Sequence, residues 1–385
     1  MRIGLLTASF DPVIGGAETY ALNLAVGLYE LGHEVLVVTD TPHGIAPSEP
    51  VERRRSFHVE RLHTYRDRLF DRERLPWEEM AFGLLAELAA TFDAFSPDVV
   101  VSNSLDTAIQ AAMMRRATGV SWAAAFHEHA PQDEPYGRGR LAVVYGDLRP
   151  HAVLAGSEFY AARAREFGPV EAVHVVHHGV PMSPHDPRLR DEWRSRYGFS
   201  PEHTVVVCVG RLKERKGIRE LVDAFATVHP RERGLRLVVA GTVSSASSAY
   251  YDLLQQRRAE AGLEDLIVFD ETVVADQIPG LMAAADIVAQ PSYEEGLGLA
   301  VLEGMAARRP VLTTHAPGID EIVTEAGLAV QVPPRDTAAL AAALDGLVRD
   351  GKLRELIAGR GYDHARRNFS LEVMARRTAD VLGAL

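Results

Sequence analysis

Short apolar runs alternate with helical patterns along most of the chain, and this alternation limits the fold more than any other feature. "RIGLLTA" at the N-terminus has the composition of a strand buried on both faces, and "GGAETYALNLAVGLYELG" follows it with apolar residues at helix spacing. Strands that alternate with helices in this way predict a parallel sheet with helices on both faces. The same rhythm continues in "HEVLVVT", "PDVVVSN", "SWAAAFH" and "AVLAGS".

A second set of such units begins at "TVVVCVG" and continues through "LRLVVAG", "LIVFD", "DIVAQPS", "RPVLTTH" and "LAVQV". The chain has 385 residues, which is too many for one ordinary hydrophobic core. The proline-containing junction "HHGVPMSPHDPRLRDE" separates the two sets. The sequence therefore predicts two doubly wound parallel-sheet domains that face a cleft, residues 1–183 and 184–369, followed by a helix over residues 370–385.

Residues 53–77 do not follow this rhythm. They contain eight arginines against four acidic residues. We interpret them as a solvated, partly helical connection within the first domain. The alternative is a basic lip that touches an acidic acceptor or an anionic membrane surface.

Charge and composition limit the partners and the compartment. The net charge is −12, which argues against nucleic acid as the main partner because phosphate backbones are bound by basic faces. Cys208 is the sole cysteine, so no disulfide can form within the chain. The N-terminal run lacks the features of a signal peptide, and no window approaches the ~18 apolar residues of a membrane span. We expect a cytoplasmic protein, with binding at a membrane surface as the less favoured alternative.

The segment "VGRLKERKGI" places four cations after a predicted strand. Arg211, Lys213, Arg215 and Lys216 follow Gly210, and the next helix begins directly after them. Crowded cations beside a helix N-terminus favour an anion between them, and a diphosphate fits this requirement. The alternative is an exposed basic turn without a ligand.

The segment "GGAE" follows the first predicted strand. Gly15 and Gly16 lack Cβ atoms, so their backbone amides could approach a phosphate group closely. The spacing is not that of the dinucleotide-binding GxGxxG motif, and a tight turn without a ligand explains the glycines equally well.

Two glutamates flank a glycine turn in "PSYEEGLGLAVLEGMA". Glu295 precedes Gly296 and Gly298, a helix is predicted to begin near Leu299, and Glu303 lies eight residues after Glu295. Carboxylates accept hydrogen bonds from vicinal hydroxyl groups, and helix amides bind phosphate. The arrangement predicts a nucleotide sugar with its hexose at the first glutamate, its ribose at the second and its diphosphate between them.

Together these motifs resemble the GT-B glycosyltransferases of family GT4, a retaining group. The resemblance covers nearly the whole chain and is strongest from Val209 to about Val330. It implies a final helix that packs back on the N-terminal domain. It also implies that Arg211 and Lys216 bind the donor diphosphate, that Glu303 binds the ribose and that Glu295 binds the donor sugar. Gly16 would then approach the donor phosphate.

The same resemblance places His127, in "AAAFHEH", beside the donor sugar. Two alternatives stay open for this histidine: a metal site shared with His129, and a purely structural role. No Asp-x-Asp pair occurs in the chain, so we predict a metal-independent enzyme without a cofactor, in which cations and helix amides stabilise the leaving group. No carboxylate pair for double displacement accompanies the motif, so retention would involve front-face attack.

Several residues depart from the family pattern. Leu297 stands where phenylalanine is usual, Gly304 where alanine is common, and Glu271 where glycine is frequent. The segment "HHGVPM" replaces the typical "NGVD". Since Glu271 bears on base recognition, the nucleotide stays open, with UDP and GDP favoured.

The sequence predicts transfer of a hexose or hexosamine to a hydroxyl group of a small-molecule, saccharide or lipid-linked acceptor. The alternatives are a GT-B nucleotide-sugar epimerase, a non-catalytic nucleotide-sugar binder and, from another class, a nicotinamide-dependent oxidoreductase. The missing GxGxxG motif argues against the last of these. Acceptor identity and oligomeric state do not follow from the sequence.

Overall fold

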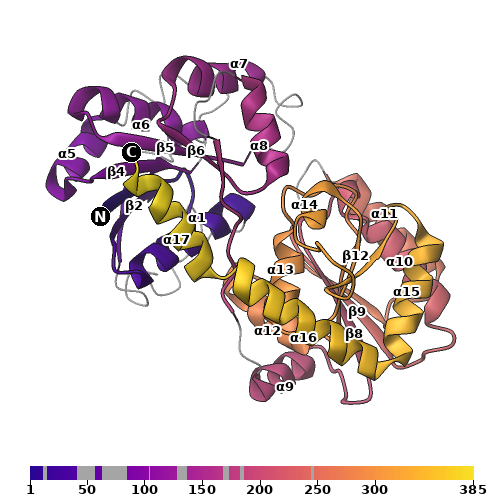
Figure 1. Ribbon diagram of the computed structural model, residues 1–385. Coiled ribbons are helices and arrows are strands. Elements are labelled where there is room, and N and C mark those ends of the chain that lie inside the picture. Colours follow the sequence, from indigo (N-terminus) through magenta and orange to yellow (C-terminus); the bar gives the residue numbers. More distant parts are fainter. Residues whose placement is uncertain are drawn as a thin grey trace. The chain divides into compact units, whose positions relative to one another are not determined.

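The computed structural model describes residues 1–11, 15–40, 57–62, 85–103, 105–127, 137–167, 173–182, 186–243 and 247–385 (Figure 1). The chain forms two compact units. The first comprises Met1–Gly179 and Leu371–Leu385, and the second comprises Val180–Ser370. Within the described ranges, no helix combines the length and apolar character that crossing a membrane requires.

The first unit is built on a parallel sheet. Within the residues described, its strands follow the order β3-β2-β1-β4-β5-β6-β7, and every neighbouring pair is parallel. The strands are β1 (Arg2–Leu6), β2 (Glu34–Asp40), β3 (His58–Leu62), β4 (Val99–Ser102), β5 (Ser121–Phe126), β6 (Ala152–Ala155) and β7 (Val173–Val175).

Helices cover both faces of this sheet because alternate strand residues point to opposite sides. On one face, α1 (Gly16–Glu30) and the final helix α17 (Leu371–Gly383) pack in a common core with strand residues such as Ile3 and Leu5. On the other face, α5 (Leu85–Phe95) and α6 (Leu105–Thr118) pack against residues such as Leu6 and Trp122. The other described helices of this unit are α7 (Gly137–Leu141), a π-helical segment (Ala142–Leu148), α8 (Glu158–Ala164) and a 3-10 turn (Arg165–Phe167).

The final helix belongs to the first unit, as the family resemblance implied. Helix α17 lies against α1 (Figure 1). The two helices approach closely at Gly27, where an added Cβ would come within 2.9 Å of the Leu371 carbonyl oxygen and 2.8 Å of the Ala375 Cβ. A glycine in α1 thus allows this close approach.

The second unit repeats the same architecture. Its described strands are also parallel and follow the order β10-β9-β8-β11-β12-β13. They are β8 (Thr204–Val209), β9 (Leu235–Ala240), β10 (Ile267–Asp270), β11 (Ile287–Gln290), β12 (Val311–Thr314) and β13 (Val330–Val332). Because the strand order reverses between β8 and β11, the crevice at their carboxyl ends is where such sheets bind ligands.

Helices again cover both sheet faces. On one face, α12 (Ile278–Ala284), α13 (Leu299–Ala306) and α16 (Gly351–Asn368) share a core with Val205 and Val288. On the other, α10 (Ile218–Val228) and α15 (Thr337–Arg349) pack against Val206 and Ala289. The remaining helices among the described residues of this unit are α9 (Pro187–Arg196), α11 (Ser248–Glu260) and α14 (Pro317–Asp320), with 3-10 turns at Glu214–Lys216 and Ala275–Gln277.

Two departures from the family pattern have packing explanations. A Cβ at Gly304 would lie only 3.0 Å from Val288 and 3.1 Å from Val311, so the missing side chain brings α13 close to the sheet. Leu297 is buried at 3% exposure in the core beneath the glycine turn.

The predicted two-sheet fold is confirmed, but two strands were missed. Residues 57–62 were interpreted as part of a solvated connection, and this was wrong: they contain β3, which pairs with β2 and buries Phe57 and Val59. The short strand β7 has three residues, too few to give a periodic signal. Residues 53–56 and 63–77, which carry most of the predicted basic lip, lie outside the described residues.

The predicted junction between domains is partly helical. The units divide between Gly179 and Val180, four residues before the predicted boundary, and the cleft between the halves stays a prediction. Helix α9 begins at Pro187, because the Asp186 carboxylate accepts hydrogen bonds from the amides of Arg188 and Leu189. Proline at the first helical position suits such a start.

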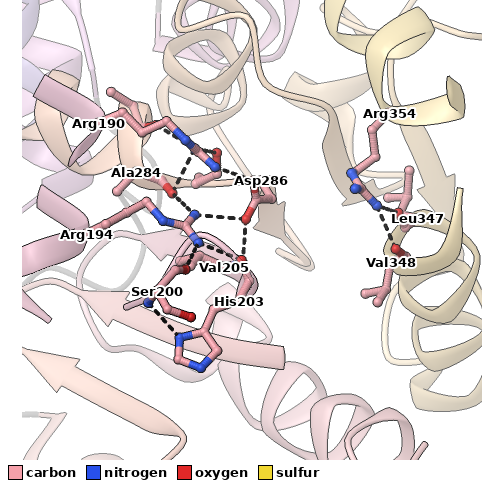
Figure 2. A network of polar contacts seen from close by, with 12 residues as sticks. Arg190, Arg194, Ser200, His203, Val205, Ala284, Asp286, Leu347, Val348 and Arg354 are labelled. Carbon is pink, nitrogen blue, oxygen red and sulfur yellow. Dashed lines mark hydrogen bonds and ion pairs between the residues drawn. The ribbon is translucent and has the colours of Figure 1, made fainter. Parts of the chain in front are cut away.

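Two arginines of α9 fix this helix to the amino-terminal edge of the second sheet (Figure 2). Arg190 and Arg194 both pair with Asp286, at 2.5 and 3.1 Å, and Asp286 also accepts from the Val205 amide at 2.8 Å. Arg194 is 4% exposed and also donates to the carbonyl oxygens of Ala284, Ser200 and His203. A similar contact ends α15, where Arg354 donates to the carbonyls of Leu347 and Val348.

We expect Asp286→Asn to lower the stability of the protein by about 1–3 kcal/mol, because an amide cannot accept hydrogen bonds at both positions and buried Arg194 loses its counter-charge. Urea unfolding measures the loss. The matched control is Asp223→Asn, which weakens the half-exposed pair of Asp223 with Arg257 and should cost under about 1 kcal/mol. Equal losses in the two variants would contradict the special role of Asp286.

Candidate active site

The four predicted cations lie at the carboxyl end of β8. The chain leaves this strand through Gly210 and forms a 3-10 turn over Glu214–Lys216, and α10 follows from Ile218. Gly217 between them has φ of 65°, and a Cβ there would lie 2.0 Å from the Pro291 carbonyl oxygen. Glycine is therefore required where this turn meets the loop after β11.

These cations are crowded, as the sequence suggested. Burial, followed by the charges of Arg211 and Arg215, lowers the pKa of the Lys213 ammonium. Arg211 itself is exposed, and its side chain pairs with no other described residue. A cation left exposed beside other cations is available to an anionic ligand.

Lys216 is instead paired with a glutamate. Its Nζ lies 2.5 Å from Glu295 Oε1, and the two side chains are 14% and 8% exposed. Arg215 lies 3.6 Å from Glu295 Oε2 and also donates to the Glu294 carbonyl oxygen at 2.9 Å. Burial acts to raise the pKa of Glu295, but the charges of Lys216 and Arg215 and its hydrogen bonds outweigh it and hold that pKa below the ordinary value.

Glu303 differs from Glu295 in its surroundings. It lies in α13, one turn from the helix start, and no partner for its carboxylate is found among the described residues. Burial raises the pKa of Glu303 to about 7, and the positive charge of Lys216 opposes this rise only in part. A desolvated carboxylate without donors is suited to accept hydrogen bonds from a bound hydroxyl-bearing ligand.

The glycine turn between the two glutamates presents a bare helix start. Gly298, with φ of 101°, precedes Leu299 as the N-cap of α13 and offers no side chain to the first amides. Gly318 allows a close approach behind the turn, since a Cβ there would lie 2.6 Å from the Glu295 carbonyl oxygen and the Gly296 carbonyl group. The predicted residues Arg211, Lys216, Glu295, Gly296, Gly298, Leu299 and Glu303 thus gather at one edge of the second sheet.

The predicted residues of the first unit gather around the start of α1. Glu18 accepts a hydrogen bond from Ser9 at 2.5 Å and turns back over Gly15, where a Cβ would lie 2.0 Å from its Oε2. At Gly16 a Cβ would meet no described atom within 4 Å. Because the end of the Glu18 side chain can move, packing among the described residues requires a glycine at neither position, and the approach of a phosphate group there stays a prediction.

Asn103 joins this helix start to His127. Its Nδ2 donates to the Ala17 carbonyl oxygen at 3.0 Å, so its Oδ1 faces His127 Nε2, also at 3.0 Å. A carbonyl oxygen cannot donate, and therefore we assign the ring proton to Nε2. Burial lowers the pKa of His127 to about 4, so its Nδ1 is an acceptor at neutral pH.

His127 packs in an aromatic cluster that the sequence did not reveal. Tyr20 and His178 lie 4.8 and 5.4 Å from it between ring centroids. Burial, and then the neighbouring His127 and His177, hold the pKa of His178 well below its ordinary value. His129, the predicted second metal ligand, lies outside the described residues.

Sequence reasoning also missed buried polar residues in both units. In the second unit, Gln290 and Ser292 are fully buried near Glu295, and in the first unit Asn103, the partner of His127, is 1% exposed. A signal was present, because each is a polar residue at the end of an apolar strand run, where parallel sheets place functional groups.

Comparison with known proteins gives the class of this chain. Residues 14–183 match the family model described as glycosyltransferase family 4, and residues 190–364 match the one described as glycosyl transferases group 1. The chain is 24% identical over 402 aligned residues to an uncharacterized glycosyltransferase of Methanocaldococcus jannaschii, covering 99% of this chain and 97% of that protein. The chain therefore belongs to the family 4 type of glycosyltransferases, whose two models match its two halves.

Two further relatives are informative. The chain is 29% identical over 228 residues to the GDP-mannose-dependent alpha-(1-6)-phosphatidylinositol monomannoside mannosyltransferase of Mycobacterium tuberculosis, a match that covers 57% of this chain and 58% of that enzyme. The solved structure of Anabaena HepE in complex with UDP and glucose superposes with a TM-score of 0.81 at 22% identity, with full coverage of both chains. This likeness shows that the fold is GT-B.

Proposed function

We propose that the enzyme transfers a hexose or hexosamine from a nucleoside-diphosphate sugar, with UDP or GDP as the nucleotide, to a hydroxyl group of a small-molecule, saccharide or lipid-linked acceptor, and that the anomeric configuration is retained. The observation that carries the proposal is the set of side chains that gather at the carboxyl ends of β8 and β11 in the second sheet. There, crowded cations and an uncapped helix start lie beside two carboxylates with different surroundings, the buried Glu295 and the partly buried Glu303. The family assignment argues against the alternative of an oxidoreductase.

Each group at this edge has a role in the proposal. Arg211, Lys216 and the first amides of α13 hold the diphosphate and stabilise the charge that develops on it as the sugar leaves. Glu303 accepts hydrogen bonds from the ribose, and Glu295 accepts one from a sugar hydroxyl. The roles of Gly15, Gly16 and His127 toward the donor rest on the family resemblance and form part of this proposal.

The reaction exchanges one bond at the anomeric carbon. The bond from C1 to the diphosphate oxygen breaks, and the acceptor oxygen forms its bond to C1 on the same face. The acceptor proton passes to the departing diphosphate oxygen. No carboxylate near C1 is required in this scheme, which suits Glu295, because its charge is engaged by Lys216 and Ser292.

A panel of donors tests the function. UDP-glucose, GDP-mannose, ADP-glucose and dTDP-glucose are compared by thermal shift, since the relatives include a GDP-mannose-dependent enzyme and a structure with UDP and glucose. A donor at 100 times its Kd adds about 2.7 kcal/mol of stability. With water as the acceptor, NMR of the freshly released sugar reports whether the configuration is retained. A panel in which no donor stabilises the protein or loses its sugar would overturn the proposal.

Turnover should not depend on a divalent metal. We expect donor cleavage to continue at an unchanged rate after treatment with EDTA, because the chain lacks an Asp-x-Asp pair and places arginine and lysine side chains where the diphosphate is proposed to bind. The measurement compares EDTA-treated enzyme with enzyme supplied with magnesium or manganese. Loss of activity on chelation, followed by recovery with either metal, would show that the electrostatic mechanism is wrong.

A further inference from the structure

A chain of buried polar side chains leads from the interior of the second sheet to Glu295. Cys208 Sγ in β8 lies 3.9 Å from Gln290 Oε1, and Gln290 Nε2 lies 3.0 Å from Ser292 Oγ. Ser292 Oγ lies 2.7 Å from Glu295 Oε1. Gln290 and Ser292 are 0% exposed, so these direct contacts are shielded from bulk solvent.

The hydrogens along this chain can point in only one direction. Glu295 is ionised, because its pKa is held below the ordinary value, and therefore it can only accept. Ser292 donates its single hydroxyl hydrogen to Glu295, so its oxygen accepts from the Gln290 amide. Burial raises the pKa of Cys208 to about 12, and the protonated thiol donates to Gln290 Oε1. Every donor thus faces the carboxylate.

The two carboxylate oxygens of Glu295 therefore have different partners. Glu295 Oε1 accepts from both Ser292 and Lys216, at 2.7 and 2.5 Å. Glu295 Oε2 has Arg215 as a more distant neighbour at 3.6 Å. The ion pair and the serine therefore hold one oxygen in place, and the other keeps capacity to accept from a ligand.

We propose that Gln290 and Ser292 are positioning residues that act through Glu295, by fixing its carboxylate so that Oε1 holds Lys216 and Oε2 meets a hydroxyl group of the donor sugar. The part that concerns the sugar rests on the proposed function. The part that concerns the carboxylate does not, and it can be measured without a ligand. Neither residue touches the substrate in this proposal.

The position of Gln290 supports a role in holding Glu295 and not merely in packing the strand. It ends a strand whose other residues, Ile287, Val288 and Ala289, are apolar and fully buried. A buried amide costs stability unless it is hydrogen-bonded, and here both ends of the amide are used in the chain to Glu295. Thr313 on β12 is equally buried, but its hydroxyl donates to the backbone carbonyl oxygen of Gln290 and not to the side-chain amide.

The ligand-free test uses Ser292→Ala and Gln290→Met, with Thr313→Val as the matched control for loss of a buried hydroxyl group. A carboxylate with a lowered pKa stabilises the folded state above the ordinary glutamate pKa, and this stability is lost as the pH falls through the lowered value. Ser292→Ala removes part of that stability. The urea midpoint of this variant should therefore lie below that of wild type at about pH 7, and the difference between the two midpoints should become smaller as the pH is lowered to below about 4.

The same urea comparison in a Glu295→Gln background shows whether Ser292 and Gln290 act on the Glu295 carboxylate. There the effect of Ser292→Ala should not change with pH, and Thr313→Val should be independent of pH in both backgrounds. A pH-dependent effect that persists without the Glu295 charge would overturn the proposal, as would a constant effect in the wild-type background. Gln290→Met should act in the same direction as Ser292→Ala and more weakly.

Donor binding tests the part that concerns the sugar. Calorimetry compares UDP-glucose with UDP and GDP-mannose with GDP. For the pair that wild type binds, Ser292→Ala should weaken binding of the sugar nucleotide about tenfold and leave the diphosphate within about twofold. Equal weakening of both would refute positioning toward the sugar. If wild type binds neither pair, the proposed function fails, while the ligand-free cycle still decides whether Ser292 and Gln290 hold Glu295.

Discussion

Arg211→Ala should lower kcat/KM for the donor by about 10²- to 10³-fold while the protein stays folded. Arg211 is exposed at the carboxyl end of β8, and its side chain forms no hydrogen bond or ion pair with another described residue, so its removal breaks no pairing among them. In the proposed complex it donates charge-assisted hydrogen bonds to the diphosphate as negative charge develops there. Losing one such donor costs about 2.7–4 kcal/mol of transition-state stabilisation.

Lys216→Met should cause a similar loss of kcat/KM, but with an additional cost in stability. Without the ammonium group, the carboxylate of Glu295 stays buried and keeps Ser292 and the more distant Arg215 as its neighbours. Breaking a buried pair by removing one partner leaves an uncompensated charge. The two cations are therefore distinguished by urea unfolding: we expect Arg211→Ala to unfold as wild type does and Lys216→Met to unfold earlier.

Steady-state kinetics with the donor selected by the panel measures both losses. Arg231→Ala is the control, because it removes an equal charge from an exposed position after α10, before the amino end of β9. It should leave kcat/KM within about twofold. Near-normal turnover by both site variants would show that the diphosphate does not bind among these cations.

The distribution of apolar residues explains which parts of the fold could be predicted. Strands such as β1 and β8 are runs of buried aliphatic residues, and their signal survives without any knowledge of partners. Strand β3 carries His58, Glu60 and Arg61 among its five residues because an edge strand is covered on fewer sides. Its local sequence therefore has the polarity of a connection, and only pairing with β2 defines it.

The candidate site shows the same division between local and long-range signals. The cations near Lys216 and the glutamates around the glycine turn could be singled out from the sequence as candidates, because each set lies within one short segment. The pairing of Lys216 with Glu295 joins residues 79 positions apart, and the contact of Cys208 with Gln290 joins residues 82 apart. Such contacts follow from the order of β8 and β11 in the sheet, which local patterns do not specify.

Glu303→Ala and Glu295→Ala should fail in different ways, since the two carboxylates have different surroundings and are proposed to hold different parts of the donor. In the proposed complex Glu303 contacts the ribose, away from the bond that breaks, so its loss should weaken binding of the sugar nucleotide and of the free diphosphate alike, by about 1–3 kcal/mol. Glu295→Ala frees the Lys216 ammonium, so the diphosphate should bind as well as in wild type or better, while kcat falls about 100-fold as the sugar loses its alignment.

The raised pKa of Glu303, about 7, adds a test by pH. Hydrogen bonds from ribose hydroxyls favour the ionised carboxylate, so binding of the diphosphate should release a proton and strengthen as the pH rises through about 7. Glu303→Gln should remove that part of the pH dependence, and the titration of the phosphate itself is common to both proteins. Calorimetry with the diphosphate alone, between about pH 6 and pH 8, separates the two glutamates. If Glu295→Ala weakens the diphosphate as much as Glu303→Ala does, the carboxylates are not divided between sugar and ribose.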